Sequence, residues 1–295
     1  MARVAVTVLV ALALLVTAPV AWAQTVTRGT LFVVGGGPQP PALVEEFVRL
    51  AGGRGKAKIA VFAMASGEGL TGGEEKAADL RALGATATNI WITREQAATD
   101  SVARLLDGVT GVWFGGGDQV RLADVLRGTA TLRAIRARFE AGAVVGGTSA
   151  GAAVLSTPMI TGDERRSGGT RPPSDSTENW LTIDRDDVIT AEGFGFITDA
   201  IVDQHFLRRK RHNRLISLVL ESPQRLGVGI DESTALVITP DGMWHVMGAS
   251  AVVIYDARES TVTSKLGTLG VAGMVMHVLP AGGRFNPHEG EAKLP

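Results

Sequence analysis

The pentapeptide Gly147-Thr148-Ser149-Ala150-Gly151 constrains this 295-residue chain more than any other stretch. It follows the apolar run 143–145 and precedes the small, apolar segment 152–155, so it reads G-x-S-x-G between a predicted strand and a predicted helix. In that setting the motif forms a sharp turn that exposes the serine hydroxyl and directs the next backbone N–H toward a developing oxyanion. Because the chain has 37 glycines, a plain glycine-rich turn is the competing interpretation, and other residues must decide between the two.

The length and composition of the chain favour a single large α/β domain over two small ones. A hydrophobic content of 45% is ample for one core, and a formal net charge of −1 gives no reason to expect a nucleic-acid partner. The chain contains no cysteine, which excludes thiol catalysis and thiolate metal sites. No H-E-x-x-H motif and no cluster of histidines is present, so neither a metal nor another cofactor is expected.

The N-terminal segment 1–23 has the features of a signal peptide. Arg3 supplies a positive charge, residues 4–20 are nearly all apolar, and Ala21-Trp22-Ala23 forms an A-x-A cleavage site. An uncleaved membrane anchor is the alternative, because the apolar run approaches spanning length. We expect cleavage, a mature domain of residues 24–295, and an exported, periplasmic or extracellular protein that is not held at the membrane afterwards.

Strand-like and helix-like segments alternate through the first half of the chain. Predicted strands cover 28–34, 58–64, 86–92 and 111–114, and predicted helices cover 42–51, 74–83, 96–106 and 120–126. This alternation predicts a parallel sheet covered by helices on both faces. The glycine turn at 35–37 lacks the G-x-G-x-x-G spacing and is followed by prolines, so it does not predict nucleotide binding. Short strands and turns between 227 and 278 predict late hairpins on the same domain.

A second glycine turn, at residues 115–117, follows the strand 111–114. Ligands of open α/β sheets bind at the carboxyl ends of strands, so this turn and the Ser149 turn are expected to face one crevice. A backbone N–H of Gly117 would then act as a second oxyanion donor beside that of Ala150. The alternative is a turn that only allows the strand to meet the helix.

A serine nucleophile needs a base and an acid that orients the base. His205 ends an apolar run between polar residues, as a side chain presented at a strand end would, and it is favoured over the other histidines. Those others, which stay open at this point, are His212, His245, His277 and His288. For the acid, Asp163 and Glu164 follow the predicted helix closely enough to return to the crevice. Asp175, Glu178 and Glu192 are further candidates.

The cationic run after His205 suggests how a substrate could be held. Arg211 and Arg214 are three apart and would share one helix face, from which they could bind carboxylates, while Asp203 could meet a cation. Arg208 and Lys210 are interpreted as a solvated helix end. The polar stretch 165–177 is predicted to be a long surface loop.

Five motifs in order give the chain a resemblance to a known family. They are GTSAGAAV, FGGGDQ, DQHF followed by R-x-R-x-x-R-L, GIDESTALVI and HVLPAGGRF, spread from about Thr30 to Phe285. Together they resemble the cyanophycinases, in the serine peptidase family that also contains aspartyl dipeptidase. The resemblance implies a three-layer α/β sandwich with a mostly parallel central sheet, of the class I glutamine-amidotransferase-like kind.

The resemblance also implies roles for individual residues. Ser149 is the nucleophile, His205 is the base, and the substrate is cyanophycin, a polyaspartate carrying arginine, which is cut to β-Asp-Arg dipeptides. The implied substrate-binding residues are Gln119, Asp203, Gln204, Arg209, Arg211 and Arg214. The family's acid is expected between the serine and the histidine, where we choose Glu164 and hold Asp163 second. An aspartyl dipeptidase-like peptidase and a non-catalytic peptide-binding protein are the rival functions, and a homodimer is left open.

Overall fold

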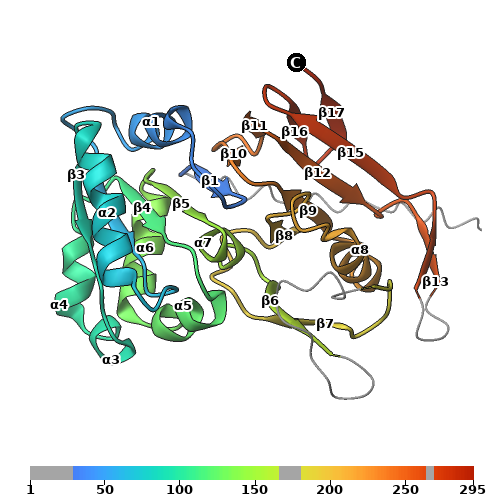
Figure 1. The fold of residues 1–295 in the computed structure, drawn as a ribbon, viewed down its shortest axis with the longest axis horizontal. Coiled ribbons are helices and arrows are strands. Elements are labelled where there is room, and N and C mark those ends of the chain that lie inside the picture. Colours follow the sequence, from blue (N-terminus) through green and yellow to red (C-terminus); the bar gives the residue numbers. More distant parts are fainter. Residues whose placement is uncertain (1–28, 166–180, 264–268) are drawn as a thin grey trace, which may run out of the picture.

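The computed structural model describes residues 29–165, 181–263 and 269–295 (Figure 1). The predicted signal peptide 1–23 and nearly all of the predicted loop 165–177 lie outside these residues. In the described part of the chain, no helix is both long and apolar enough to cross a membrane.

A mixed nine-stranded sheet forms the centre of the molecule, and one half of it is parallel. The parallel half has the order β1-β5-β4-β2-β3. Its strands are β1 (Leu31–Val34), β2 (Lys58–Phe62), β3 (Thr86–Asn89), β4 (Gly111–Phe114) and β5 (Val144–Thr148). Val34 of β1 lies opposite Thr148 of β5, and Phe114 of β4 lies opposite Gly147. The carboxyl ends of three strands therefore meet beside the G-x-S-x-G turn.

The other half of the sheet is antiparallel and extends from β1. Its strands are β10 (Thr234–Ile238), β11 (Trp244–Gly248), β16 (Arg284–Asn286) and β17 (Glu291–Lys293), in the order β17-β16-β11-β10. The β10–β11 hairpin agrees with the hairpins predicted between 227 and 278, while β16 and β17 lie beyond that range. The antiparallel half also makes the nine-stranded sheet mixed, because the sheet has as many antiparallel as parallel strand pairs.

Alternating side chains of the parallel strands pack into two cores, one on each face. Phe32 and Val34 belong to the core under α1 (Pro41–Leu50) and α2 (Gly69–Ala82). Leu31 and Val33 point to the opposite core. Helices on that second side are α3 (Arg94–Ala97), α4 (Asp100–Ala103), the 3-10 turn η1 (Arg104–Leu106), α5 (Gln119–Leu126), α6 (Ala130–Glu140) and α7 (Ala150–Ala153). Helices on both faces confirm the predicted layered α/β arrangement.

Two helical regions differ from the expectation. The segment 96–106, predicted as one helix, is broken into α3, α4 and η1, because Thr93 and Thr99 each cap a new helix start with the side-chain oxygen. The helix α6 was not predicted at all. Its hydrophobic face is made of only a few residues, chiefly Leu132, Ile135 and Phe139, between arginines and alanines.

A second, four-stranded sheet lies beside α7 and carries the other half of the candidate site (Figure 1). Its strands are β8 (Ala200–Gln204), β9 (Leu226–Ile230), β12 (Ala251–Asp256) and β15 (Val275–Pro280), with α8 (His212–Glu221) packed on it. The remaining strands form two small pairs: β6 (Met159–Glu164) with β7 (Val188–Ala191), and β13 (Thr261–Thr263) with β14 (Gly270–Ala272). Strands β8 and β9 are parallel, with Gln204 opposite Ile230.

Candidate active site

Ser149 lies in the sharp turn between β5 and α7, as the motif predicts. Its φ of 55° and ψ of −114° are unusual for a residue with a side chain, and its N–H donates to the carbonyl of Val34 at 3.0 Å. A Cβ at Gly147 would lie 2.5 Å from the carbonyl oxygen of Gly151, and one at Gly151 would lie 2.6 Å from the carbonyl carbon of Phe114. The two glycines are therefore required by close backbone approach, and the plain-turn interpretation does not account for the strained serine.

The Ser149 hydroxyl meets His205, which follows β8 directly. The Oγ atom lies 2.8 Å from Nε2 of His205, and the two residues are 56 positions apart in the chain. The His205 backbone has a φ of 50°, and its N–H donates to the carbonyl of Gly35 at 2.6 Å. Only 11% of the His205 side chain is exposed. The serine and histidine predicted as a catalytic pair are thus in hydrogen-bond contact.

The carboxylate on the other side of the imidazole belongs to Glu232. Its Oε1 lies 2.6 Å from Nδ1 of His205, and 27% of the side chain is exposed. Glu164, expected in this place, lies at the end of β6, and Asp163 precedes it there. The contact corrects both expectations: the acid that orients His205 comes from beyond the histidine in the chain.

The position of Glu232 follows from the register of two neighbouring strands. Because β8 and β9 are parallel and Gln204 lies opposite Ile230, the residues just past those positions emerge at the same edge. His205 is one residue past Gln204, and Glu232 is two past Ile230. The signal was present in the motif GIDESTALVI, which places two acids at the end of an apolar strand.

Burial sets the protonation state of the base. Loss of solvent around the imidazole lowers the pKa of His205, and the nearby cations Arg209 and Arg211 lower it further, while the hydrogen bond to Glu232 opposes the shift. His205 is therefore neutral at neutral pH, as a base that accepts the serine proton must be.

The glycine turn 35–37 after β1 makes room for this arrangement. A Cβ at Gly36, whose φ is 107°, would lie 2.8 Å from Nδ1 of His205 and closer still to Cε1 and Nε2. A Cβ at Gly37 would lie 2.8 Å from Cβ of Glu232, and the carbonyl of Gly36 accepts the N–H of Ser233 at 2.8 Å. This turn, which the sequence left without a role, forms the surface against which His205 and Glu232 pack.

The glycine turn 115–117 lies beside the serine, as expected from the sequence. A Cβ at Gly116 would lie 3.4 Å from Cβ of Ser149 and 3.9 Å from its Oγ. Gly117 has a φ of 134° and sits close to the backbone of Ala65, where a Cβ would lie 2.5 Å from the carbonyl carbon. The two turns are thus adjacent, while a common crevice and the N–H groups of Gly117 and Ala150 as oxyanion donors stay predictions.

Three of the predicted substrate-binding side chains form a buried network beneath the site. Asp203 and Arg214 are each 1% exposed, and Nε of Arg214 donates to Oδ2 of Asp203 at 2.7 Å while its Nη2 meets Oδ1. Arg211 is 7% exposed and lies 3.8 Å from the same carboxylate. These contacts tie the end of β8 to the start of α8, which is a scaffolding arrangement. Contact with substrate stays a prediction for them.

Gln204 and Gln119 also make structural hydrogen bonds. The carbonyl and Oε1 oxygens of Gln204 accept from Nη1 of Arg211 at 2.8 and 2.5 Å. The amide of Gln119 donates to the carbonyls of Ile160 and Thr161 at 2.9 and 2.7 Å, which joins α5 to β6. Substrate contact likewise stays a prediction for both.

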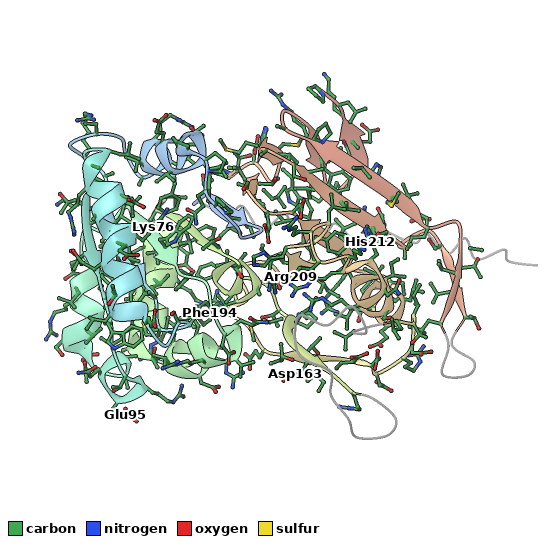
Figure 2. All side chains as sticks on the ribbon, viewed as in Figure 1. Lys76, Glu95, Asp163, Phe194, Arg209 and His212 are labelled. Atoms are coloured by element: carbon green, nitrogen blue, oxygen red, sulfur yellow. The ribbon has the colours of Figure 1, made fainter. Side chains whose placement is uncertain are left out.

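Arg209 differs from the other two predicted arginines because it is exposed. Its backbone N–H donates to the carbonyl of His205 at 2.9 Å, and the positive charge of its guanidinium helps to lower the pKa of the His205 imidazole. Figure 2 shows it near the middle of the molecule, beside the elements that carry the serine and the histidine. Within the predicted set, this guanidinium is the one best placed to meet an acidic substrate.

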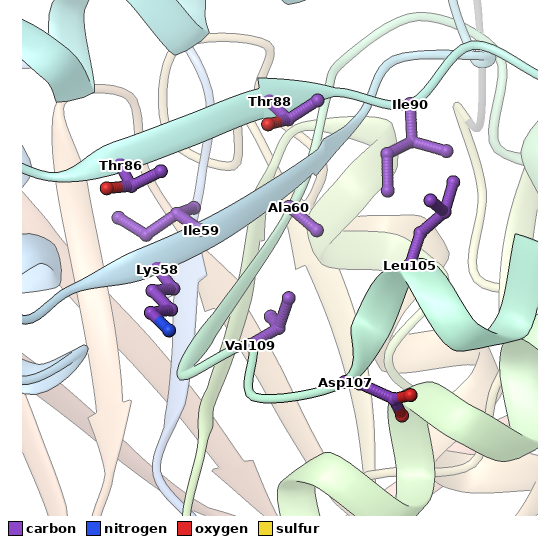
Figure 3. A pocket seen from close by; sticks show the side chains of 9 residues that line it. All are labelled: Lys58, Ile59, Ala60, Thr86, Thr88, Ile90, Leu105, Asp107 and Val109. Carbon is purple, nitrogen blue, oxygen red and sulfur yellow. The ribbon is translucent and has the colours of Figure 1, made fainter.

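Other groups considered from the sequence lie elsewhere. His212 belongs to a packed aromatic group, with Nδ1 2.5 Å from the hydroxyl of Tyr255 and its ring against Phe206. A cavity of about 220 Å³ is lined by residues of β2, of β3 and its end, and of the segment 105–109, and no residue of the Ser149 turn lines it (Figure 3). Across the three described ranges, no group of three or more histidines and carboxylates is gathered as a metal site.

Comparison with known proteins identifies the family. A family model described as peptidase family S51 matches residues 31–246, which include Ser149, His205 and Glu232. The chain belongs to this family. Among solved structures, the crystal structure of a peptidase from an acI-B1 Actinobacterium has a TM-score of 0.60 at 23% identity, covering 84% of this chain and 97% of its own. The S51 chain has the class I glutamine-amidotransferase-like α/β fold implied by the resemblance.

Curated relatives of this S51 chain are named cyanophycinase. The protein from Trichormus variabilis (strain ATCC 29413 / PCC 7937) is 41% identical over 202 residues, which cover 66% of this chain and 63% of the relative. The protein from Geminocystis herdmanii (strain PCC 6308) is 33% identical over 270 residues, covering 88% of this chain and 94% of the relative. The match thus spans less than two thirds of the Trichormus protein and nearly all of the Geminocystis protein.

Proposed function

We propose that this protein is a serine peptidase that degrades cyanophycin to β-Asp-Arg dipeptides through an acyl-enzyme on Ser149. The observation that carries the proposal is the hydrogen-bonded chain Ser149–His205–Glu232, with contacts of 2.8 and 2.6 Å. A hydroxyl on a strained turn, a neutral imidazole within reach of its proton and a carboxylate on the far ring nitrogen are the parts that acyl transfer needs.

The proposed reaction begins with attack of the Ser149 oxygen on a backbone aspartyl carbonyl while Nε2 of His205 accepts the hydroxyl proton. The resulting oxyanion is stabilised by backbone N–H groups, for which Gly117 and Ala150 are the candidates. Collapse breaks the C–N bond, and the imidazolium gives its proton to the leaving amine. Water, deprotonated by the same imidazole, then hydrolyses the ester and restores the serine. Throughout, Glu232 accepts the Nδ1–H hydrogen bond and stabilises the imidazolium.

The choice of substrate rests on the relatives and on the charge of the site. Proteins named cyanophycinase match this chain at 41% and 33% identity. The exposed Arg209, whose backbone N–H donates to the carbonyl of His205, adds a cation that could bind the free carboxylate of an arginine carried by the polymer. The surface around Arg209 would be held in place from the protein interior by five buried, motif-matched residues: Gln119, Asp203, Gln204, Arg211 and Arg214.

The test compares the purified protein with a Ser149→Ala variant on insoluble cyanophycin, with mass analysis of the released products. The natural protein is expected to release β-Asp-Arg, and the variant should lose about 10⁶-fold in turnover while keeping its thermal unfolding profile. Asp-X dipeptides serve as a second substrate, because an aspartyl dipeptidase would cut these and leave the polymer intact. Failure to release product from either, together with no labelling by a fluorophosphonate, would favour a non-catalytic binding protein.

We also propose that the protein is exported after removal of residues 1–23. The support is the charged start, the apolar run and the Ala21-Trp22-Ala23 cleavage pattern. N-terminal sequencing of the protein recovered from medium or periplasm should give Gln24 as the first residue. An intact Met1 on a membrane-bound protein would contradict cleavage.

A further inference from the structure

We propose that a cavity behind α7, separate from the Ser149 site, binds a small dianion. The cavity measures about 390 Å³ and is lined by residues from the end of α5, the first half of α6 and the segment 192–198. Three arginines, Arg127, Arg133 and Arg136, are part of its wall. Liquid water occupies about 30 Å³ per molecule, so the space admits a small polyatomic anion with some of its hydration.

The cavity lies at the opposite end of α7 from the nucleophile. One wall of the cavity, the segment around Phe194, is hydrogen-bonded to the residues that follow α7. The backbone N–H of Phe194 donates to the carbonyl of Val154 at 2.5 Å, and the backbone N–H of Phe196 donates to the carbonyl of Leu155 at 2.9 Å. Figure 2 labels Phe194 below α7, apart from Arg209. A ligand here would contact neither Ser149 nor His205, so this inference stands without the proposed peptidase activity.

The wall of the cavity carries more positive than negative charge. Arg127 is paired with Glu192, the lining carboxylate, at 3.9 Å and also donates to the Glu192 carbonyl at 3.2 Å. Arg133 donates only a long hydrogen bond, 3.3 Å, to the carbonyl of Gly128. Two lining guanidinium groups, those of Arg133 and Arg136, are thus left without a carboxylate from the lining residues.

Arg136 and Thr157 supply the polar groups that point to a ligand. The half-buried Arg136 stacks on the ring of Phe196 at 4.9 Å, and within the described chain its guanidinium has no hydrogen bond or ion pair. The Oγ1 atom of Thr157 is buried and also lacks a hydrogen-bond partner among the described residues. Buried hydroxyls nearly always have a partner, so an unpaired one at a cavity wall is a reason to expect a ligand.

The two groups converge on the space above Gly195. A Cβ at Gly195 would lie 3.3 Å from Nη2 of Arg136 and 3.5 Å from Oγ1 of Thr157. A guanidinium whose face is covered by an aromatic ring keeps its in-plane N–H donors, which fit carboxylate and phosphate oxygens. With the Arg136 guanidinium and the Thr157 hydroxyl together, and the exposed Arg133 on the wall of the same cavity, the favoured ligand is a small dianion, either a phosphate or a short dicarboxylate.

The test is calorimetric titration of the natural protein with inorganic phosphate and, separately, with succinate, at low ionic strength and without peptidase substrate. At least one of the two is expected to bind saturably at one site per chain. Arg136→Ala should weaken that binding about tenfold or more, because it removes a charge-assisted hydrogen bond. Thr157→Val should weaken it by about threefold without lowering the unfolding temperature, because the lost hydroxyl has no protein partner.

The matched control is Arg104→Ala, which removes the same charge from an exposed residue outside the cavity and should leave the affinity unchanged. Binding of phosphate alone identifies a phosphate site, and binding of succinate alone identifies a carboxylate site. The proposal is overturned if neither anion binds saturably, or if Arg136→Ala binds as tightly as the natural protein while folding normally.

Discussion

Two hydrogen-bonded pairs, each of an acidic and a basic side chain, lie next to each other at the end of β8, and they differ in how far they are buried. Asp203 and Arg214 are sealed from solvent, each 1% exposed, and hold one another through two hydrogen bonds. His205, two residues after Asp203, and its partner Glu232 are 11% and 27% exposed on their side chains, and the imidazole meets the Ser149 hydroxyl. The backbone makes the difference: β8 ends at Gln204, and a φ of 50° at His205 turns the imidazole out of the strand direction.

Neighbouring polar side chains at one strand end can therefore serve stability and chemistry separately. A buried ion pair contributes little net free energy when intact, but removing one partner costs about 3–5 kcal/mol because a charge is left unpaired in the interior. A partly exposed pair costs less to break. The carboxylate of Glu232 instead matters when the imidazole becomes positively charged during the reaction. We therefore expect substitutions in the His205–Glu232 pair to change mainly the reaction rate, and substitutions in the Asp203–Arg214 pair to change mainly the stability of the fold.

The largest effect after loss of the serine should come from Glu232→Gln. The amide keeps the shape of the side chain but cannot stabilise the imidazolium, so kcat should fall about 10³- to 10⁴-fold with little change in unfolding temperature. The measurement is steady-state hydrolysis of β-Asp-Arg-containing substrate. Glu164→Gln is the matched control, and an equal loss in that variant would mean that the acid has been assigned to the wrong carboxylate.

A smaller loss of rate is expected from Gly36→Ala. The added methyl would overlap the imidazole of His205, so the ring must shift away from Ser149 and kcat/KM should fall about 10²-fold. The rate of fluorophosphonate labelling should fall in parallel. Gly53→Ala controls for backbone strain, because Gly53 also has a positive φ, 81°, but nothing lies within 4 Å of its added Cβ. Similar labelling rates in the two variants would argue that Gly36 does not position the histidine.

Asp203→Asn should act mainly on stability. It removes the buried carboxylate that accepts two hydrogen bonds from Arg214, and we expect the free energy of unfolding to drop by about 3–5 kcal/mol in denaturant titrations. At temperatures where the variant stays folded, kcat should change less than in Glu232→Gln. The opposite result, normal stability with lost substrate affinity, would restore the substrate-binding role that the family resemblance implies for Asp203.

The smallest effect is a change in pH dependence for Arg209→Ala. Burial is the main cause of the lowered pKa of His205, and the charge of Arg209 adds to it. Removing that charge raises the pKa of the imidazole. Because the neutral ring is the active form, the acidic limb of the kcat/KM profile should move to higher pH. Arg208→Ala, at the neighbouring exposed position, should leave the limb in place, and a shift of both variants alike would point to general surface charge.

Local sequence was enough to predict the Ser149–His205 pair, which the structure brings into hydrogen-bond contact. The G-x-S-x-G pattern could be recognised from five consecutive residues, although part of the reason for its glycines is tertiary: Gly147 is crowded by Gly151 of the same turn, and Gly151 by Phe114 of the neighbouring strand β4. His205 could be chosen because an apolar strand ends immediately before it. Alternating strands and helices likewise predicted the layered fold, whereas α6 was missed because its apolar face is sparse.

The acid, the role of the turn 35–37 and the buried pair were decided only by tertiary structure. Glu232 reaches His205 because β8 and β9 pair in parallel with Gln204 opposite Ile230, and no local pattern states which strands become neighbours. Gly36 matters because a residue 169 positions later packs on it, as the sequence numbers 36 and 205 show. Contacts of this kind depend on strand order and register, which arise from packing many segments together rather than from any segment by itself.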